Sequence, residues 1–321
     1  MKIQWYPGHM HKAQKEVREI LPQVDLIIEI LDARIPFSSE NPMIAKLRGD
    51  KPTIKIFNKT DLADNNKTKI WQNHFKDAKN IETLALNAKE SDHKQQIFNL
   101  INTMFPRKHN SVKVIHALIM GIPNVGKSTL INTLSSRPIA KTGNEPAVTK
   151  ILQRIKLDEG ITLFDTPGML WGDIENEHSG YRLAITGGIK ETAFELPDVA
   201  SYAVEYLMKN YPERLHERYG IPIATIEDFL TNNAYADEAI LEIIGKDRGC
   251  LVGGGKIDLD KVSRILITEI RDGYLNGLTF ETPSMMEKEL KIVESLRIEK
   301  EAKKLAKQEK KKHRKNKRTF S

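Results

Sequence analysis

Apolar and polar positions in the first half of the chain fall into two kinds of pattern. Apolar residues recur at helical spacing over 10–21, and further helical repeats lie near 64–76, 92–104 and 127–134. Short apolar runs bounded by turn residues separate them and predict strands at 24–31, 53–57, 81–86, 112–120, 150–157 and 161–165. This alternation predicts an α/β fold in which helices cover both faces of a mostly parallel sheet.

The pattern changes after about residue 179. Residues 190–281 carry helical repeats interrupted by prolines and glycines, which indicates a helical domain. At roughly 150 residues per domain, a chain of 321 residues is expected to hold about two domains. We therefore expect an α/β domain at 1–178, a helical domain at 179–282 and a tail at 283–321.

Composition narrows the class of protein. Hydrophobic residues make up 40% of the chain and charged residues 29%, which is too apolar for disorder throughout. No apolar run approaches the ~18 residues that a membrane span requires, and the first residues lack the apolar core of a signal peptide. The single cysteine, Cys250, excludes an intrachain disulfide framework and a cysteine-cluster metal site. These features predict a protein of the reducing cytoplasm.

Positive charge is concentrated near the C-terminus. Between residues 297 and 318 lie twelve Lys or Arg and three Glu, a net charge of +9; because the whole chain carries +7, the rest carries −2. A cationic tail on a near-neutral body is typical of a protein that binds polyanions, although a tail that only keeps the chain soluble is the alternative. The predicted RNA-contacting residues are Lys303, Lys304, Lys307, Lys310, Lys311, Lys312, Arg314, Lys315, Lys317 and Arg318.

A glycine-containing loop joins a predicted strand to a predicted helix. Residues 121–128 match the P-loop pattern G-x-x-x-x-G-K-[ST] in the strand–loop–helix context that the motif requires. Backbone N–H groups and the helix N-terminus can hold a phosphate, Lys127 can reach the β- and γ-phosphates, and the Ser128 hydroxyl can bind Mg²⁺. The predicted nucleotide-binding residues of this loop are Asn124, Val125, Gly126, Lys127, Ser128 and Thr129.

A second phosphate motif, D-T-P-G at 165–168, ends a predicted strand. Asp165 is placed to hold Mg²⁺, and the Gly168 N–H can approach the γ-phosphate because glycine has no side chain in the way. Thr149 lies between the two phosphate motifs and is the candidate threonine that joins Mg²⁺ to the γ-phosphate. We expect Ser128, Thr149 and Asp165 to form the Mg²⁺ site.

A base-reading motif, N-K-x-D, directly follows the predicted strand at 53–57, and its residues are Asn58, Lys59, Thr60 and Asp61. An Asp carboxylate accepts two hydrogen bonds from guanine, whereas adenine would leave it unpaired. A second loop, similar to the S-A-K loop that offers a backbone N–H to guanine O6, is predicted at Asn87, Ala88 and Lys89. N-K-x-D alone is compatible with a polar turn, but beside two phosphate motifs it predicts GTP and not ATP.

The order of the motifs is unusual. In Ras-like chains the P-loop comes first and the base reader last, whereas here N-K-T-D and N-A-K precede the P-loop, P-A-V-T and D-T-P-G. With complete parts in this cyclically shifted order, the chain resembles the circularly permuted bacterial GTPases of the ribosome biogenesis GTPase A (YlqF-type) family. The resemblance spans about residues 3–280 and departs from the family pattern at Asn87 and Ala147. Further stretches that resemble the family lie at 5–10, 32–36, 121–129 and 248–258.

The resemblance implies a circularly permuted P-loop GTPase domain, then a helical RNA-binding domain and the basic tail. It implies GTP and GDP as ligands and Mg²⁺ as cofactor. Asn124 is similar to the asparagine that potassium-activated GTPases use, so K⁺ is a further expected cofactor. The implied function is that of an assembly factor, expected to be monomeric, which docks on the large ribosomal subunit and its rRNA with GTP and leaves after hydrolysis.

Hydrolysis is expected to be slow without a partner. Ras-like enzymes orient water with a glutamine directly after D-x-x-G, and this chain has Met169 there. The resemblance singles out His9 as the candidate catalytic residue, with a surface or structural histidine as the alternative. Two other functions stay open: a GTP-dependent switch that acts on a protein partner, and a GTP-dependent RNA-modifying protein, for which the sequence offers no second catalytic constellation.

Overall fold

The computed structural model describes residues 3–87, 93–106, 114–140 and 152–319, without the side chains of His9 and of residues 310–319. Met1–Glu281 forms one compact unit and Thr282–Ser321 a second. Within the described ranges, no helix is both long enough and apolar enough to cross a membrane.

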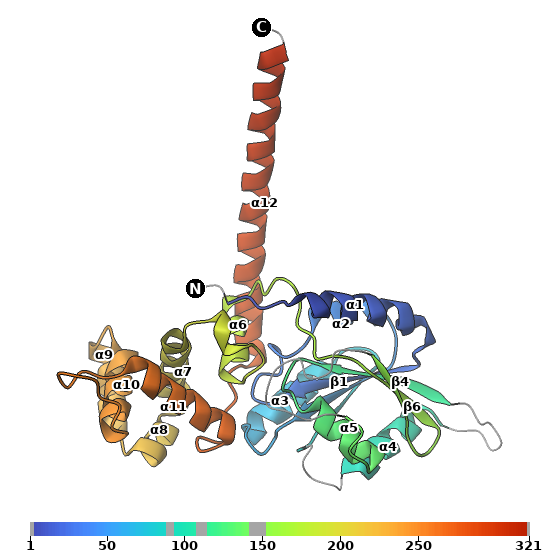
Figure 1. Ribbon diagram of the computed structural model, residues 1–321, viewed down its shortest axis with the longest axis horizontal. Coiled ribbons are helices and arrows are strands. Elements are labelled where there is room, and N and C mark those ends of the chain that lie inside the picture. Colours follow the sequence, from blue (N-terminus) through green and yellow to red (C-terminus); the bar gives the residue numbers. More distant parts are fainter. Residues whose placement is uncertain (1–2, 88–92, 107–113, 141–151, 320–321) are drawn as a thin grey trace. The chain divides into compact units, whose positions relative to one another are not determined.

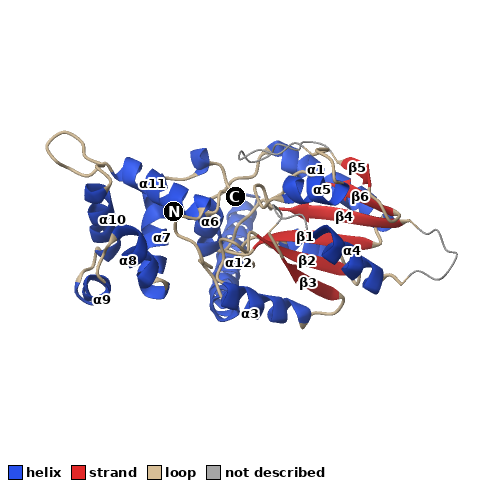
Figure 2. Cartoon of the chain, turned by 90° about the horizontal axis from the view of Figure 1, so that it is seen from below, coloured by secondary structure: helices blue, strands red, loops and turns tan. Residues whose placement is uncertain are grey.

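A six-stranded sheet lies in the first unit (Figures 1 and 2). Its order is β3-β2-β1-β4-β6-β5, and all neighbours are parallel except β5, which is antiparallel to β6. The inner strands are almost wholly buried, which explains why they read as continuous apolar runs. The strands are β1 (Leu26–Asp32), β2 (Thr53–Asn58), β3 (Ile81–Ala85), β4 (Ile115–Gly121), β5 (Gln153–Lys156) and β6 (Ile161–Asp165).

Helices cover both faces of this sheet (Figure 1). On one face, Val17 of α1 (Gly8–Ile20) and Ile44 of α2 (Pro42–Leu47) belong to a buried cluster that includes Leu118 of β4. The helix α3 packs against β3, while α4 and α5 lie on the face opposite α1. The bounds of these three helices are α3 (Asn65–Lys76), α4 (His93–Met104) and α5 (Lys127–Ser135).

The chain then builds a helical region from α6 to α11. Proline at the first turn of α7 and α8 suits a helix start, and left-handed glycines at 220 and 273 end α8 and α11. The elements are α6 (Glu177–Ile185), α7 (Leu196–Asn210), α8 (Pro212–Tyr219), α9 (Ile223–Asn232), α10 (Ala236–Asp247) and α11 (Leu259–Asp272). Past α11 the backbone returns to the α/β part, where the N–H of Leu278 donates to the carbonyl of Leu62, between β2 and α3, at 3.0 Å.

The structure confirms the predicted mixed α/β fold and adds helices that the sequence patterns did not predict. The helix α2 has only six residues and begins at Pro42 under an Asn41 cap, which is too short for a helical repeat to show. The tail forms a long helix, α12 (Pro283–Thr319), in the second unit. Its lysine, glutamate, alanine and leucine content favours a helix, and no proline or glycine follows Pro283.

Candidate functional site

The loop between β4 and α5 has the geometry of a phosphate cradle. β4 ends at Gly121, and α5 begins at Lys127 with Gly126 as its N-cap. Gly126 has a φ of 94°, and a Cβ atom there would lie 2.1 Å from Nδ2 of Asn58, so glycine is required. The N-terminus of α5 adds N–H groups and positive potential that favour a phosphate.

A hydrogen bond joins the base reader to this loop. Nδ2 of Asn58 donates to the carbonyl of Val125 at 2.6 Å, across 67 positions of sequence. Asn58 is buried at the end of β2, and the strand register places it opposite Asp32 at the end of β1. Two of the predicted motifs therefore meet at the carboxyl edge of the parallel strands, where open α/β sheets bind their ligands.

Lys127 and Asp165 form a buried ion pair between the start of α5 and the end of β6. Burial raises the pKa of the Asp165 carboxyl and lowers the pKa of the Lys127 ammonium, and the charge of each partner opposes the shift in the other. Among the described residues, Oδ2 of Asp165 has no hydrogen-bond partner. A carboxylate oxygen is therefore left for a hard cation, which fits Mg²⁺.

The residues that follow Asp165 pack against the P-loop. A Cβ atom on Gly168 would lie 3.0 Å from Cα of Pro123, so a side chain there would collide with backbone. The N–H of Met169 donates to the carbonyl of Gly121 at 3.1 Å, and the Met169 side chain is buried. The position at which Ras-like enzymes carry their glutamine therefore holds a buried apolar side chain here.

The base reader leaves β2 in a left-handed turn. Lys59 has a φ of 63°, and its Nζ atom pairs with Oδ2 of Asp32 at 2.9 Å. Asp61 follows with an exposed side chain, so its carboxylate is accessible to a ligand. A cavity of about 320 Å³ opens beside the reader and is lined by Thr60, Asn65, Thr68, Lys69, Gln72 and Ala85.

The structure describes some of the remaining predicted residues and not others. Asn87 follows β3, and its N–H donates to Nε2 of His93 at 3.4 Å. Ser128 and Thr129 lie in the first turn of α5. His9 lies in the first turn of α1, without a described side chain. The predicted residues outside the described ranges are Ala88, Lys89 and Thr149.

Contacts that the sequence did not predict tie the P-loop to the helical region. Nδ2 of Asn124 donates to the carbonyl of Gly187, just beyond α6, at 2.8 Å. Arg271 of α11 donates to the carbonyls of Ile185 at 2.9 Å and Ala184 at 2.8 Å, which satisfies the C-terminal end of α6. A glycine after an apolar repeat signals a helix end in sequence, but nothing in the sequence identifies the arginine that meets it.

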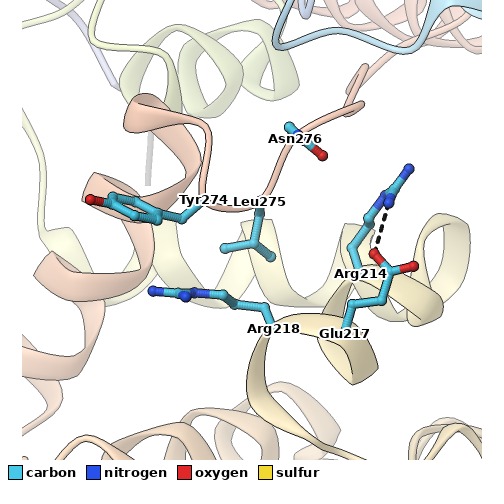
Figure 3. Close-up of a pocket in the computed structure, with 6 residues that line it drawn as sticks. All are labelled: Arg214, Glu217, Arg218, Tyr274, Leu275 and Asn276. Carbon is cyan, nitrogen blue, oxygen red and sulfur yellow. Dashed lines mark hydrogen bonds and ion pairs between the residues drawn. The ribbon is translucent and has the colours of Figure 1, made fainter.

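A second cavity, of about 210 Å³, lies in the helical region (Figure 3). The Arg218 guanidinium lies 4.9 Å from the ring centre of Tyr274, and it also pairs with Glu269. None of the predicted nucleotide-binding residues that the structure describes lines this cavity. Its lining residues are Arg214, Glu217, Arg218, Tyr274, Leu275 and Asn276.

The predicted RNA-contacting cations belong to α12 in the second unit. Lys303, Lys304 and Lys307 have exposed side chains. For the other seven, the structure describes a helical backbone without the side chains.

Known proteins are similar to this chain in sequence and in fold. The family model described as "50S ribosome-binding GTPase" matches residues 116–217. Ribosome biogenesis GTPase A of Bacillus cereus is 43% identical over 306 residues, which cover 92% of this chain and 99% of the relative. The protein of the same name from Bacillus licheniformis is 44% identical over 293 residues, 89% of this chain and 100% of the relative.

Two solved structures share the fold over most of the chain. GDP-bound YlqF gives a TM-score of 0.60 at 26% identity, over 84% of this chain and 99% of that one. GNP-bound YlqF from T. maritima gives a TM-score of 0.59 at 25% identity, over 85% of this chain and 98% of that one. With these matches and with the shifted motif order folded around one P-loop, the chain belongs to the ribosome biogenesis GTPase A family and is a GTPase that binds guanine nucleotides.

Proposed function

We propose that this protein is an assembly factor of the cytoplasm that binds the large ribosomal subunit and its rRNA. In this proposal GTP promotes docking and hydrolysis promotes release. The observation that carries its nucleotide part is the Asn58–Val125 hydrogen bond, because it joins a guanine-reading motif to a phosphate-binding loop. The name of the matched family model, a ribosome-binding GTPase, supports the ribosomal target.

Nucleotide recognition is assigned to the motifs as follows. Asp61 accepts hydrogen bonds from guanine, Lys127 binds the β- and γ-phosphates, and the backbone around Gly126 wraps the phosphates. Ser128, Thr149 and Asp165 would hold Mg²⁺, which neutralises phosphate charge during transfer. Asn124 would hold K⁺, because its side-chain oxygen is a ligand type that hard cations accept.

Stimulated hydrolysis is assigned to His9. The apolar side chain of Met169 is buried, so the polar group that orients the attacking water must come from elsewhere in the chain or from a partner. We expect His9→Ala to lower ribosome-stimulated kcat by about 10²-fold, the low end for a positioned acid–base or water-orienting group, with GTP affinity nearly unchanged. His11→Ala, two positions along the same helix, is the matched control and should behave like wild type in the same phosphate-release assay. Equal stimulated rates for His9→Ala and wild type would contradict the assignment.

RNA contact is assigned to α12 and to the helical region. Lysines on α12 supply charge, while exposed Tyr274 beside Arg218 offers a ring and a guanidinium plane on which an unpaired base can stack. These groups support binding to RNA more than to a protein surface.

Co-sedimentation with ribosomal subunits tests the proposal. The protein should pellet with the large subunit in a non-hydrolysable GTP analogue and much less in GDP. If six or more cations of α12 contact phosphates, affinity should fall by at least about 10³-fold between roughly 50 and 200 mM salt. Deletion of residues 297–321 should weaken binding and flatten that salt dependence.

A variant with the ten predicted RNA-contacting cations changed to glutamine is the matched control for the deletion, because glutamine keeps helix propensity while it removes charge. It should behave like the deletion. Binding that ignores both salt and the tail would favour a protein partner instead.

A further inference from the structure

The turn after β1 holds a buried network of charges next to the base reader. Asp32 is 1% exposed, and Arg34 is 2% exposed. The Asp32 carboxylate accepts hydrogen bonds from Nε and Nη2 of Arg34 at 3.0 and 2.8 Å, and from Nζ of Lys59 at 2.9 Å. A carboxylate with this many charge-assisted bonds sits in one geometry.

We infer that Asp32 is the positioning residue of the base reader: its carboxylate fixes the Lys59 ammonium, and the aliphatic stem of Lys59 is thereby held ready to pack on guanine. The inference rests on the proposed role of the N-K-T-D motif. A free lysine would lose rotamer freedom when a nucleotide binds, and fixing it beforehand removes that cost from the binding equilibrium.

The turn that carries Asp32 is itself fixed from two sides. On the side of the sheet, the N–H of Ala33 donates to the carbonyl of Asn58 at 2.9 Å. On the other side, Nη1 of Arg34 donates to the carbonyl of Ile270 in α11 at 3.4 Å, and the N–H of Phe280, past α11, donates to the carbonyl of Arg34 at 2.8 Å. The residues that follow Asp32 are therefore held by contacts that do not involve the Lys59 side chain.

The surrounding charges keep the Asp32 carboxyl ionised at neutral pH, so its ion pair with Lys59 persists there. Burial alone would raise the pKa of the Asp32 carboxyl, but the charges of Arg34 and Lys59 outweigh burial and hold that pKa well below its usual range. Burial lowers the pKa of Lys59, Asp32 opposes that shift, and Arg34 adds to it. Without the carboxylate, two cations would face each other, and Lys59 would be repelled from its place.

Calorimetric titration of the full-length protein with GDP and with a non-hydrolysable GTP analogue tests the inference. We expect Asp32→Asn to weaken both ligands by about tenfold or more, the loss of one charge-assisted hydrogen bond. The effect should be the same for both because it acts at the base and not at the γ-phosphate. In a double-mutant cycle with Lys59→Met, Asp32→Asn should add little to the loss, because Asp32 acts through Lys59.

Glu29→Gln is the matched control. Glu29 lies three residues earlier on β1, is equally buried, and pairs with Lys55 at 2.5 Å instead of Lys59. It should bind both nucleotides within about twofold of wild type, since it loses a comparable ion pair without a link to the reader. If Asp32→Asn does not fold, the double variant Asp32→Asn with Arg34→Met removes the stranded cation and takes its place in the cycle.

The outcomes separate the inference from the proposal beneath it. Two outcomes would overturn the role of Asp32 alone. In the first, Lys59→Met weakens nucleotide binding and Asp32→Asn does not. In the second, the losses of affinity in the two single variants simply add in the double variant. A Lys59→Met variant that binds GDP like wild type would overturn the role of Lys59 and the inference with it, whereas an Asp61→Asn variant that keeps its preference for guanine would overturn the base reader. Weakened single variants with a non-additive double variant support both.

Discussion

Replacing Lys127 with methionine is expected to lower kcat/KM for GTP by about 10³-fold. Lys127 is proposed to bind two phosphate groups, and losing two charge-assisted hydrogen bonds costs about 4 kcal/mol in total. Most of the loss should appear as weaker nucleotide binding in a titration, and the rest as slower turnover in a phosphate-release assay. A variant within a few-fold of wild type in both would remove Lys127 from the site.

The same substitution should also weaken the fold. Without Lys127 the buried Asp165 carboxylate has lost its ion-pair partner, and breaking a buried pair this way costs about 3–5 kcal/mol. Lys55→Met is the matched control, because Lys55 is also a buried lysine, paired with Glu29 and Glu40. Thermal unfolding should show both variants destabilised, while only Lys127→Met loses nucleotide. Equal loss of nucleotide in the two would assign the effect to folding.

Asp61→Asn should change which base the protein prefers. The carboxylate is proposed to accept from two guanine N–H groups, so its loss is expected to weaken GDP binding by about 10²–10³-fold. The variant should bind xanthosine diphosphate more tightly than wild type does. Xanthine carries a carbonyl where guanine has its amino group, and the asparagine amide can donate to that carbonyl. Competition between the two nucleotides measures the preference directly.

Asp64→Asn is the matched control for the change at Asp61. Asp64 lies three positions later and caps α3 by accepting from the N–H groups of Asn66 and Lys67. Asparagine caps helices as well as aspartate does, so the fold and the preference for guanine should both persist. If Asp61→Asn kept its preference for GDP, another residue would have to read the base.

The strands could be predicted closely because buried parallel strands need unbroken apolar runs. The run at 53–57 became β2 (Thr53–Asn58), and the run at 161–165 became β6. The short α2 could not be predicted, since six residues give too few turns for a repeat.

The site could be predicted as motifs but not as contacts. The sequence motifs identified Asn58 and Val125 as site residues, and the structure shows that a hydrogen bond joins them. The Asp32–Lys59 pair depends on which residues of β1 and β2 stand opposite each other, and strand patterns do not carry that register across a helical crossover. The Asn124–Gly187 contact joins parts that are 63 positions apart, so local sequence gives no sign of it.

The position of β1 at the centre of the sheet sets an order for synthesis. β2 and β3 lie on one side of it, and β4, β6 and β5 on the other, so the first three strands to be translated are neighbours in space. Chains fold from the N-terminus as they are made, and β1 to β3 can assemble before β4 has been translated to pair with the second edge of β1. A nascent chain therefore completes the half that carries N-K-T-D first, and the P-loop and Asp165 join it only when translation has passed β6.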